Sequence, residues 1–299
     1  MVSEEPSAAA EATVAGARPG GTWGSVLSSQ EFAAIGGVGF APVGQVFGAA
    51  VYAAGSASGY ACPGAQGSPG GALPARPAAP VQARGDPGVF GPLVEAMYQA
   101  RRVAVDRMTA ECAGLGGHGV VGVNLASGSF FLGGLEFTAI GTAVRATGAA
   151  GLRVPFTSAL SGQDFAKLIR AGWVPAGLVL GIAIGSRHDD RTTTRQARPW
   201  SGNAEMAGWT ELVNQTRQDA RRRLEQDVRR LGAEGVVTAD MRMRVRQRDC
   251  PVTVGRRDHI VEVLLTGTAI VGFASADRPA GPPLAIMPLG PWRGTRART

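Results

Sequence analysis

The sequence predicts an α+β protein made of two tandem copies of a small β-α-β-β unit, with one long helix packed on an antiparallel sheet in each copy. Three sequence blocks occur twice, in the same order, at offsets of 133, 116 and 126 residues. This order indicates a tandem duplication with loops of unequal length. The matching blocks are 29–51 with 162–184, "LGGHGVVGV" (115–123) with "LGAEGVVTA" (231–239), and "EFTAIGTAV" (136–144) with "EVLLTGTAI" (262–270).

Each copy opens with a short helix and an apolar segment punctuated by glycine, "FAPVGQVFGAAVYAA" or "VPAGLVLGIAIG". The short length and the β-branched residues of these segments favour buried strands. We expect a long helix after this strand, because apolar residues recur there at steps of three and four positions. These stripes are Leu93, Met97, Ala100, Ala104, Met108 and Cys112 in the first copy, and Trp209, Val213, Thr216, Ala220, Leu224, Val228 and Leu231 in the second.

Two more strands follow each long helix. Gly116 and Gly232 are placed to end the helices, and each is followed within a few residues by a Val-Val pair. We expect the two copies to pack as a pseudo-symmetric pair, since a small sheet leaves edges that another sheet can cover. The residues expected to be buried there are Val120, Val121, Val236 and Val237.

Composition sets the expected domain boundaries. The chain has 44 Gly and 19 Pro among 299 residues, concentrated in stretches that lack the apolar content of a packed core. We expect the two copies at 22–147 and 155–273, a disordered loop at 55–91, and disordered tails at 1–21 and 274–299. The second tail contains "PLAIMPLGPW", which either docks on a protein partner or packs back on its own domain.

Basic residues are concentrated in the second half of the chain. Residues 1–150 hold seven basic and nine acidic side chains, a net charge of −2, and residues 151–299 hold 23 and 14, a net charge of +9. The three cysteines form no Cys-x-x-Cys motif, and we find neither an N-terminal apolar run of signal-peptide length nor an apolar span of 18 residues. These features predict a cytoplasmic protein that does not associate with a membrane.

The repeated blocks resemble the YbjQ-like family, which is labelled heavy-metal-binding. The resemblance rests on a Val-x-Gly-x-Val strand, a long helix ending in Leu-Gly, a Val-Val strand and a closing Gly-Thr-Ala strand, and both copies carry it. It implies a compact αβ unit that assembles into a pentameric ring. It also implies a soft divalent metal, although the residues themselves leave the cofactor unknown.

A metal site is the first candidate for function. Cys250, Asp258 and His259 flank the turn of the last hairpin and carry donor groups that soft metals accept. Arg256 and Arg257 would repel a cation there. The other donors have simpler interpretations: His118 is a surface turn residue replaced by Glu234 in the repeat, Cys112 belongs to an apolar stripe, and Cys62 lies in the loop.

A row of arginines is the second candidate. Arg242, Arg244, Arg246 and Arg248 alternate along one predicted strand, so their side chains share one face. This row, the Arg strand, is either a solvated or salt-bridged face or a site for anions or nucleic acid. The helix residues that could extend it are Arg221, Arg222, Arg229 and Arg230.

The sequence contains no phosphate-binding loop, and Glu136 and Glu262, which recur at matching positions, do not demonstrate a catalytic pair. We therefore expect a non-enzymatic, self-associating binding or structural module. The alternatives are a heavy-metal-binding protein and, more remotely, an anion or nucleic-acid binder. Self-association and a protein partner for the tail at 274–299 are the expected interactions, and nucleic acid is not expected.

Overall fold

The computed structural model confirms two repeated units, each with three long antiparallel strands and one long helix. The structure describes residues 24–53, 90–130, 134–148, 154–196, 202–203, 205–250 and 255–273. The predicted tails at 1–21 and 274–299, and residues 55–89 of the predicted loop, lie outside the described residues. Each unit has the predicted order of strand, helix, strand, strand.

The first copy contains five elements. They are α2 (Ser29–Gly36), β1 (Phe40–Ala53), α3 (Gly91–Gly114), β2 (Gly119–Phe130) and β3 (Gly134–Ala146). The second copy contains β4 (Phe156–Thr157), α4 (Gly162–Arg170), β5 (Trp173–His188), α5 (Arg191–Gln196), α6 (Ala207–Arg230), β6 (Gly235–Asp249) and β7 (Arg257–Gly272). The strand orders are β1-β3-β2-β4 in sheet one and β5-β7-β6 in sheet two.

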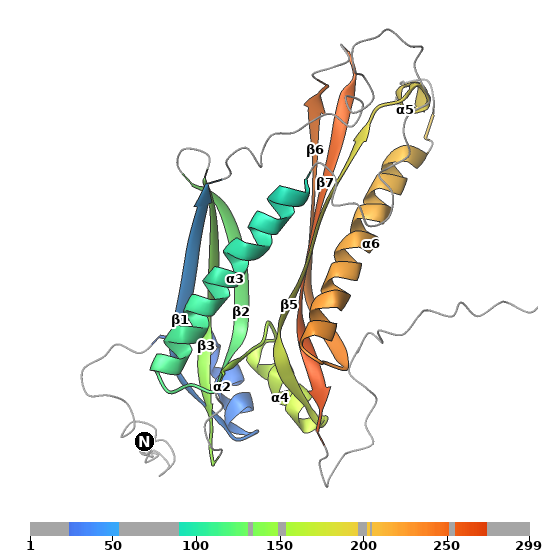
Figure 1. Cartoon of the computed structure of the whole chain (residues 1–299). Helices are drawn as coiled ribbons and strands as arrows, with labels where there is room; N and C mark the ends of the chain where they lie inside the picture. Colours follow the sequence, from blue (N-terminus) through green and yellow to red (C-terminus); the bar gives the residue numbers. More distant parts are fainter. Residues whose placement is uncertain are drawn as a thin grey trace, which may run out of the picture.

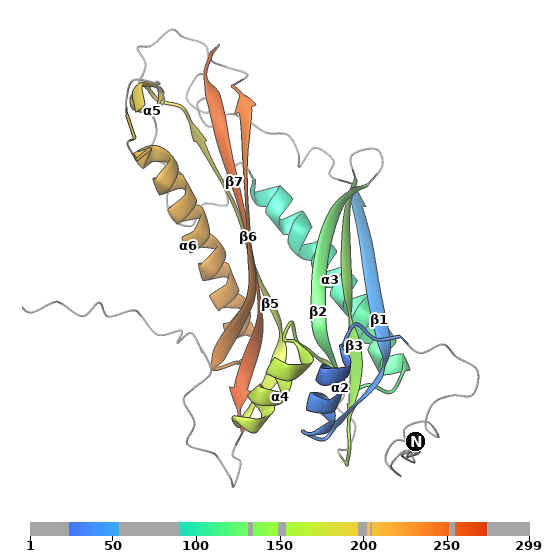
Figure 2. The same ribbon diagram turned by 180° about the vertical axis from the view of Figure 1, so that it is seen from behind.

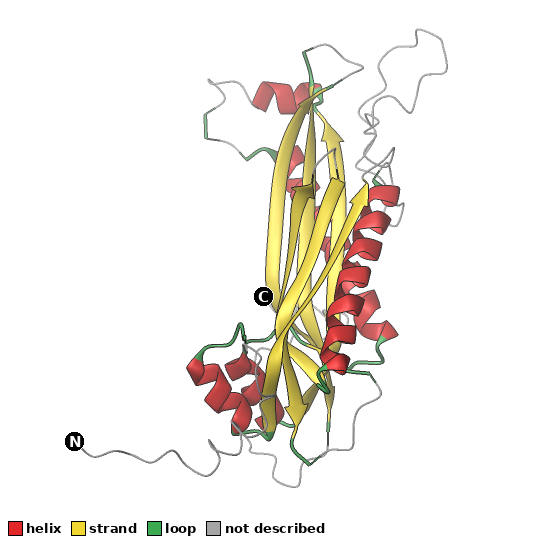
Figure 3. Cartoon of the chain, turned by 90° about the vertical axis from the view of Figure 1, so that its left-hand side faces the viewer, coloured by secondary structure: helices red, strands yellow, loops and turns green. Residues whose placement is uncertain are grey.

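The two copies stack in the order sheet one, α3, sheet two, α6 (Figures 1 and 2). The long strands run along the molecule, and the short helices gather at its ends (Figure 3). Helices α2 and α4 begin in the same way, with Ser28 and Ser161 capping them through their hydroxyl groups. The two short helices lie against each other, where Gln163 donates to Gln30, its equivalent in the repeat.

Helix α3 is buried on two sides. One apolar core joins α3 and sheet one to Leu180, Ile182 and Leu264 of sheet two. Helix α6, in contrast, buries a single stripe against sheet two. The buried residues of α3 are Val94, Met97, Ala100, Arg101, Ala104, Met108 and Cys112, and those of α6 are Leu212, Thr216, Ala220, Leu224 and Val228.

Both long helices approach their own sheets closely because a glycine stands at the contact. A Cβ atom on Gly48 would overlap the carbonyl oxygen of Ala104, and one on Gly181 would overlap that of Ala220. The repeated glycines of the first sequence block therefore set the distance between helix and sheet.

A short extended segment before α4 connects the copies. We call residues 156–160 the second strap and the equivalent residues 24–27 the first strap. The second strap pairs with the edge of β2 in the first copy. It is also fixed to its own copy, because Ser158 bonds Thr268, as Ser25 of the first strap bonds Thr142.

The predicted valine contacts are largely confirmed. Val120, Val121 and Val236 are buried, and Val237 is half-buried. A shared cluster joins Val121 to α4 and to residues of β3 and β7. The two copies therefore form one packed body through this cluster and through α3.

The prediction of buried first strands is wrong on one face of β1. Phe47 and Val51 are 49% and 50% exposed, because they lie on the face of sheet one opposite α3. Leu231, predicted to belong to the apolar stripe of α6, is also exposed. Each of these residues lies at the outside of the two-copy stack.

The close approach at glycine predicts the cost of adding one methyl group. The Gly181→Ala substitution should lower the free energy of unfolding by about 1–3 kcal/mol, because the helix backbone has to move away. Urea unfolding followed by circular dichroism measures this change. Gly114→Ala is the matched control, since a Cβ atom there meets nothing within 4 Å, and an equal loss in both variants would contradict this explanation.

Candidate functional site

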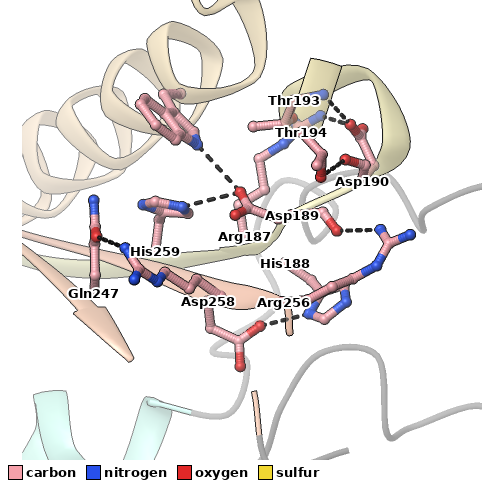
Figure 4. A network of polar contacts seen from close by, with 12 residues as sticks. Arg187, His188, Asp189, Asp190, Thr193, Thr194, Gln247, Arg256, Asp258 and His259 are labelled. Carbon is pink, nitrogen blue, oxygen red and sulfur yellow. Dashed lines mark hydrogen bonds and ion pairs between the residues drawn. The ribbon is translucent and has the colours of Figure 1, made fainter. Parts of the chain in front are cut away.

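A buried group of potential metal ligands lies at the end of sheet two. His188 ends β5, Asp258 lies opposite it near the start of β7, and Cys250 follows β6. One ligand atom from each residue lies within 4.8 Å of those from the other two. His188 Nδ1 is 2.7 Å from Asp258 Oδ1, and the Asp258 side chain is fully buried (Figure 4). We call these three residues the His-Cys-Asp cluster.

A second polar group lies on the other face of the same strands. His259 Nε2 is 2.9 Å from Asp189 Oδ1, and the His259 ring lies against Trp209 at 4.5 Å between centroids. Asp190 directly precedes α5 and accepts a hydrogen bond from the Thr193 backbone amide at 2.7 Å, which holds the pKa of Asp190 below its usual value. These contacts fix the turn that follows β5.

The structure brings together two of the three predicted ligands. Cys250 and Asp258 lie in the cluster, whereas His259 points to the opposite face because successive residues of a strand alternate. His188 takes its place. The sequence prediction considered only the last hairpin, and His188 lies 70 positions before Asp258, so the strand register was needed to find it.

The two arginines expected to repel a cation have partners of their own. Arg256 Nη1 donates to the Asp189 carbonyl oxygen at 2.6 Å, as Figure 4 shows. Arg257 Nη1 donates to Gln247, and its Nε lies 3.8 Å from Asp249. Both guanidinium groups are therefore engaged by residues outside the cluster.

The donor set of the cluster fits a soft or borderline divalent metal. A thiolate, an imidazole and a carboxylate are ligands of zinc and of softer ions. Zinc lies about 2.0–2.3 Å from such donors, so donor atoms need to be about 3–4 Å apart. The spacing within 4.8 Å therefore requires small side-chain movements, and the His188–Asp258 hydrogen bond would have to open.

The other cysteine and histidine candidates have structural roles. Burial raises the pKa of Cys112 to about 11, and its thiol donates to the Gly119 carbonyl oxygen. His118 Nδ1 accepts a hydrogen bond from the Ala146 amide at 3.2 Å. Cys62 lies outside the described residues.

The Arg strand is β6, an outer strand of sheet two that is exposed over most of its length. Its arginines face the side of α3, because Arg242 and Arg244 lie opposite Leu264 and Glu262. Arg242 is paired with Asp240 at 2.6 Å. Helix α6 covers the other face of the sheet, so its arginines do not extend this row. The ion pairs of α6 are Arg221 and Arg229 with Glu225, Arg222 with Asp219, and Arg230 with Asp227.

Glu136 and Glu262 belong to different sheets, on β3 and β7. Glu262 lines a small cavity with Arg101, which is almost completely buried. Desolvation lowers the pKa of Arg101 to about 10, although the nearby charge of Glu262 opposes this shift. Arg101 also lies over the Phe137 ring at 5.2 Å. Apolar periodicity did not indicate this burial, because Arg101 lies next to the apolar stripe of α3 and is itself charged.

The repeated sheet-and-helix units define a tandem αβ protein that carries a group of ligand-type residues at one end of its second sheet. The sequence model of the YbjQ family, described as "Putative heavy-metal-binding", matches residues 88–147 and 174–272. The chain belongs to this family and carries two copies of its domain. It is also 37% identical over 222 residues to encapsulin nanocompartment protein Rv1762c of Mycobacterium tuberculosis, covering 71% of this chain and 75% of that protein.

Within the described residues, no helix is both long enough and apolar enough to cross a membrane.

Proposed function

We propose that this protein is a non-enzymatic, self-associating module that binds the protein forming an encapsulin compartment. The observation that carries this proposal is the similarity to the encapsulin nanocompartment protein, which extends over 71% of the chain. A match of this length includes more than one copy of the domain. It therefore supports a shared role for the whole two-copy body.

The geometry supports a binding role. Four of the titratable groups at the end of sheet two are paired with one another, His188 with Asp258 and His259 with Asp189. Strand β6, in contrast, exposes residues on both of its faces. Such a strand is suited to contact with another protein.

We assign the contact with the compartment protein to the C-terminal segment at 274–299. Its sequence places Leu284, Ile286, Met287, Leu289 and Trp292 in a short stretch with several prolines. A short apolar segment attached to a folded module can bind a groove on a partner while the module keeps its own fold. The family motifs end before this segment, at residue 272, so the family resemblance does not account for it.

Removal of residues 274–299 should abolish co-purification with the compartment protein. After co-expression, we expect the full chain to elute with the assembled compartment on size-exclusion chromatography. The amount of truncated chain in the compartment fraction should be at least about tenfold lower, because buried apolar anchors dominate such contacts. Replacing four apolar residues of the segment with serine should have the same effect. These residues are Leu284, Ile286, Leu289 and Trp292. The matched control is the variant in which Arg293, Arg296 and Arg298 are replaced with serine, since it keeps the apolar residues.

If the full chain does not co-purify, the compartment protein is not its partner. If the truncated chain co-purifies as well as the full chain, the contact lies on the folded copies instead.

A second candidate function is the binding of a soft divalent metal at the His-Cys-Asp cluster. It is favoured by the grouping of three ligand atoms within 4.8 Å and by the donor chemistry. When bound, the metal would cross-link the ends of β5, β6 and β7. This function is compatible with a binding module and does not require a reaction.

Equilibrium dialysis against cadmium or zinc at pH 7 tests this candidate. We expect about one ion per chain, and a loss of affinity of about 10- to 100-fold in Cys250→Ser and His188→Ala, because each removes one of three ligands. Cys112→Ala is the matched control, since this thiol is buried in the core of the first copy. Absence of stoichiometric binding, or equal loss in the control, would contradict the metal function.

A further inference from the structure

A buried arginine with unbonded donor groups lies between the two copies. Arg101 of α3 is 2% exposed, and its Nε and Nη1 atoms donate to no acceptor among the described residues. Buried donors in proteins are almost always bonded to protein, to water or to an ion, because an unbonded buried charge is costly. The two N–H groups of Arg101 therefore indicate a place where an acceptor from outside the chain can bind.

Arg101 lines a small cavity together with side chains of both copies. The cavity has a volume of about 10 Å³, which suits one water-sized group such as an oxygen atom of an anion. Arg242 and Arg244 of β6 also line it and are exposed to solvent, and Ser127 of β2 adds a hydroxyl group. Glu262 is the single carboxylate in this lining, so three positive charges meet one negative charge. This balance favours an anion over a cation.

The strand register directs the two exposed arginines of the cavity toward α3. Arg242 lies opposite Leu264 of β7, and Arg244 lies opposite Glu262. Leu264 belongs to the core around α3, and residues two positions apart on a strand share a face. Strand β6 of the second copy therefore presents both guanidinium groups on the side where the first copy presents Arg101. The arginines come together only because the two copies pack on each other.

A second, larger cavity adjoins the small one. Its volume is about 470 Å³, and Arg242 lines both cavities. The lining also continues along the strands, since Leu125 and Thr266 of the larger cavity lie two positions from Ser127 and Leu264 of the smaller. Apolar residues of both straps contribute to its wall. Small-molecule sites commonly have volumes of about 300–1,000 Å³ and combine apolar walls with a few polar groups.

The carboxylates of the larger cavity are already engaged within the protein. Asp240 accepts a hydrogen bond from Arg242 Nε at 2.6 Å. Glu31 accepts hydrogen bonds from the Ser28 amide at 2.8 Å and from the Gly162 amide at 2.9 Å. These contacts offset the negative charge of both carboxylates, so the larger cavity suits an uncharged part of a ligand.

We propose that the cleft between the two copies binds a small organic anion, with a carboxylate or phosphate oxygen accepting hydrogen bonds from Arg101 and the apolar body of the molecule in the larger cavity. Arg242 and Arg244 bind the remaining oxygens at the exposed side. A nucleic-acid strand does not fit this site, because Arg101 is buried and only a terminal group can reach it. The site goes beyond the contact with the compartment protein and does not depend on it.

Calorimetric titration of the purified full chain tests this site. The probes are phenyl phosphate and phenylacetate, which carry the two head groups on the same ring, and inorganic phosphate. We expect one site per chain for at least one ring compound, and the tighter of the two identifies the preferred head group. Inorganic phosphate should bind at least about fivefold more weakly than phenyl phosphate, because it buries no apolar surface in the larger cavity.

Substitution of the arginines should separate the buried donor from the exposed ones. Arg101→Met should weaken binding of the tighter ring compound about 10- to 100-fold, because it removes charged hydrogen-bond donors inside the cleft. Arg244→Met should weaken it about three- to tenfold, since this charge is exposed. Glu262→Gln should strengthen binding about two- to fivefold, because a neighbouring negative charge is lost.

Arg217→Met is the matched control for Arg101→Met. Arg217 is the equivalent of Arg101 at the repeat offset of 116 residues, but it is exposed on α6 and does not belong to the lining of either cavity. This variant should bind the probes as the wild type does.

Thermal unfolding without any probe establishes that each variant is folded. Arg101→Met should be about as stable as the wild type, because replacing a buried charge with an apolar side chain of similar size is often neutral. Arg244→Met carries the test if Arg101→Met does not fold. Absence of binding of all three probes to the wild type, or equal losses in the Arg101 and Arg217 variants, would overturn the proposal. Loss of the contact with the compartment protein would leave these titrations unchanged.

Discussion

Helix α3 has to be covered on two sides, and this requirement holds the two copies together. Its inner stripe packs on sheet one, and its outer side carries Tyr98 and Arg101 into contact with sheet two. A buried guanidinium group is costly unless charges and aromatic faces compensate for its lost hydration. The Phe137 ring and the nearby charge of Glu262 in the second copy offset part of this cost for Arg101, whose Nε and Nη1 have no hydrogen-bond partner among the described residues. The first copy therefore depends on the second for the environment of its own helix.

Because the unit is duplicated, a single chain supplies both sheets that cover α3. Glycine at 48 and 181 lets each helix lie directly on its sheet, and the second strap then adds to the free edge of β2. The second copy has the same sheet and helix but no further copy within the chain to cover α6. Its outer side is accordingly polar, with Asn214 and Arg217 exposed.

Much of the fold could be predicted from the sequence, because the repeated sequence blocks indicated two units with the same order of helices and strands. The order of elements, the long helices and most of the buried stripe followed from the repeated blocks and their apolar spacing. Periodicity did not indicate which face of β1 lies outside the stack, so Phe47 was expected to be buried. His188 was missed for a similar reason, since only the register of β5 on β7 places it beside Asp258. Long-range partners of this kind depend on the packing of the sheets.

The shared burial of α3 makes the two copies one cooperative unit. Native-state hydrogen exchange measures this most directly, through the opening free energies of backbone amides in β3 and β7. We expect the most protected amides of both strands to open together, with opening free energies that agree within about 0.5 kcal/mol. Exchange of the β7 amides through a separate opening of lower free energy, while β3 stays protected, would contradict it.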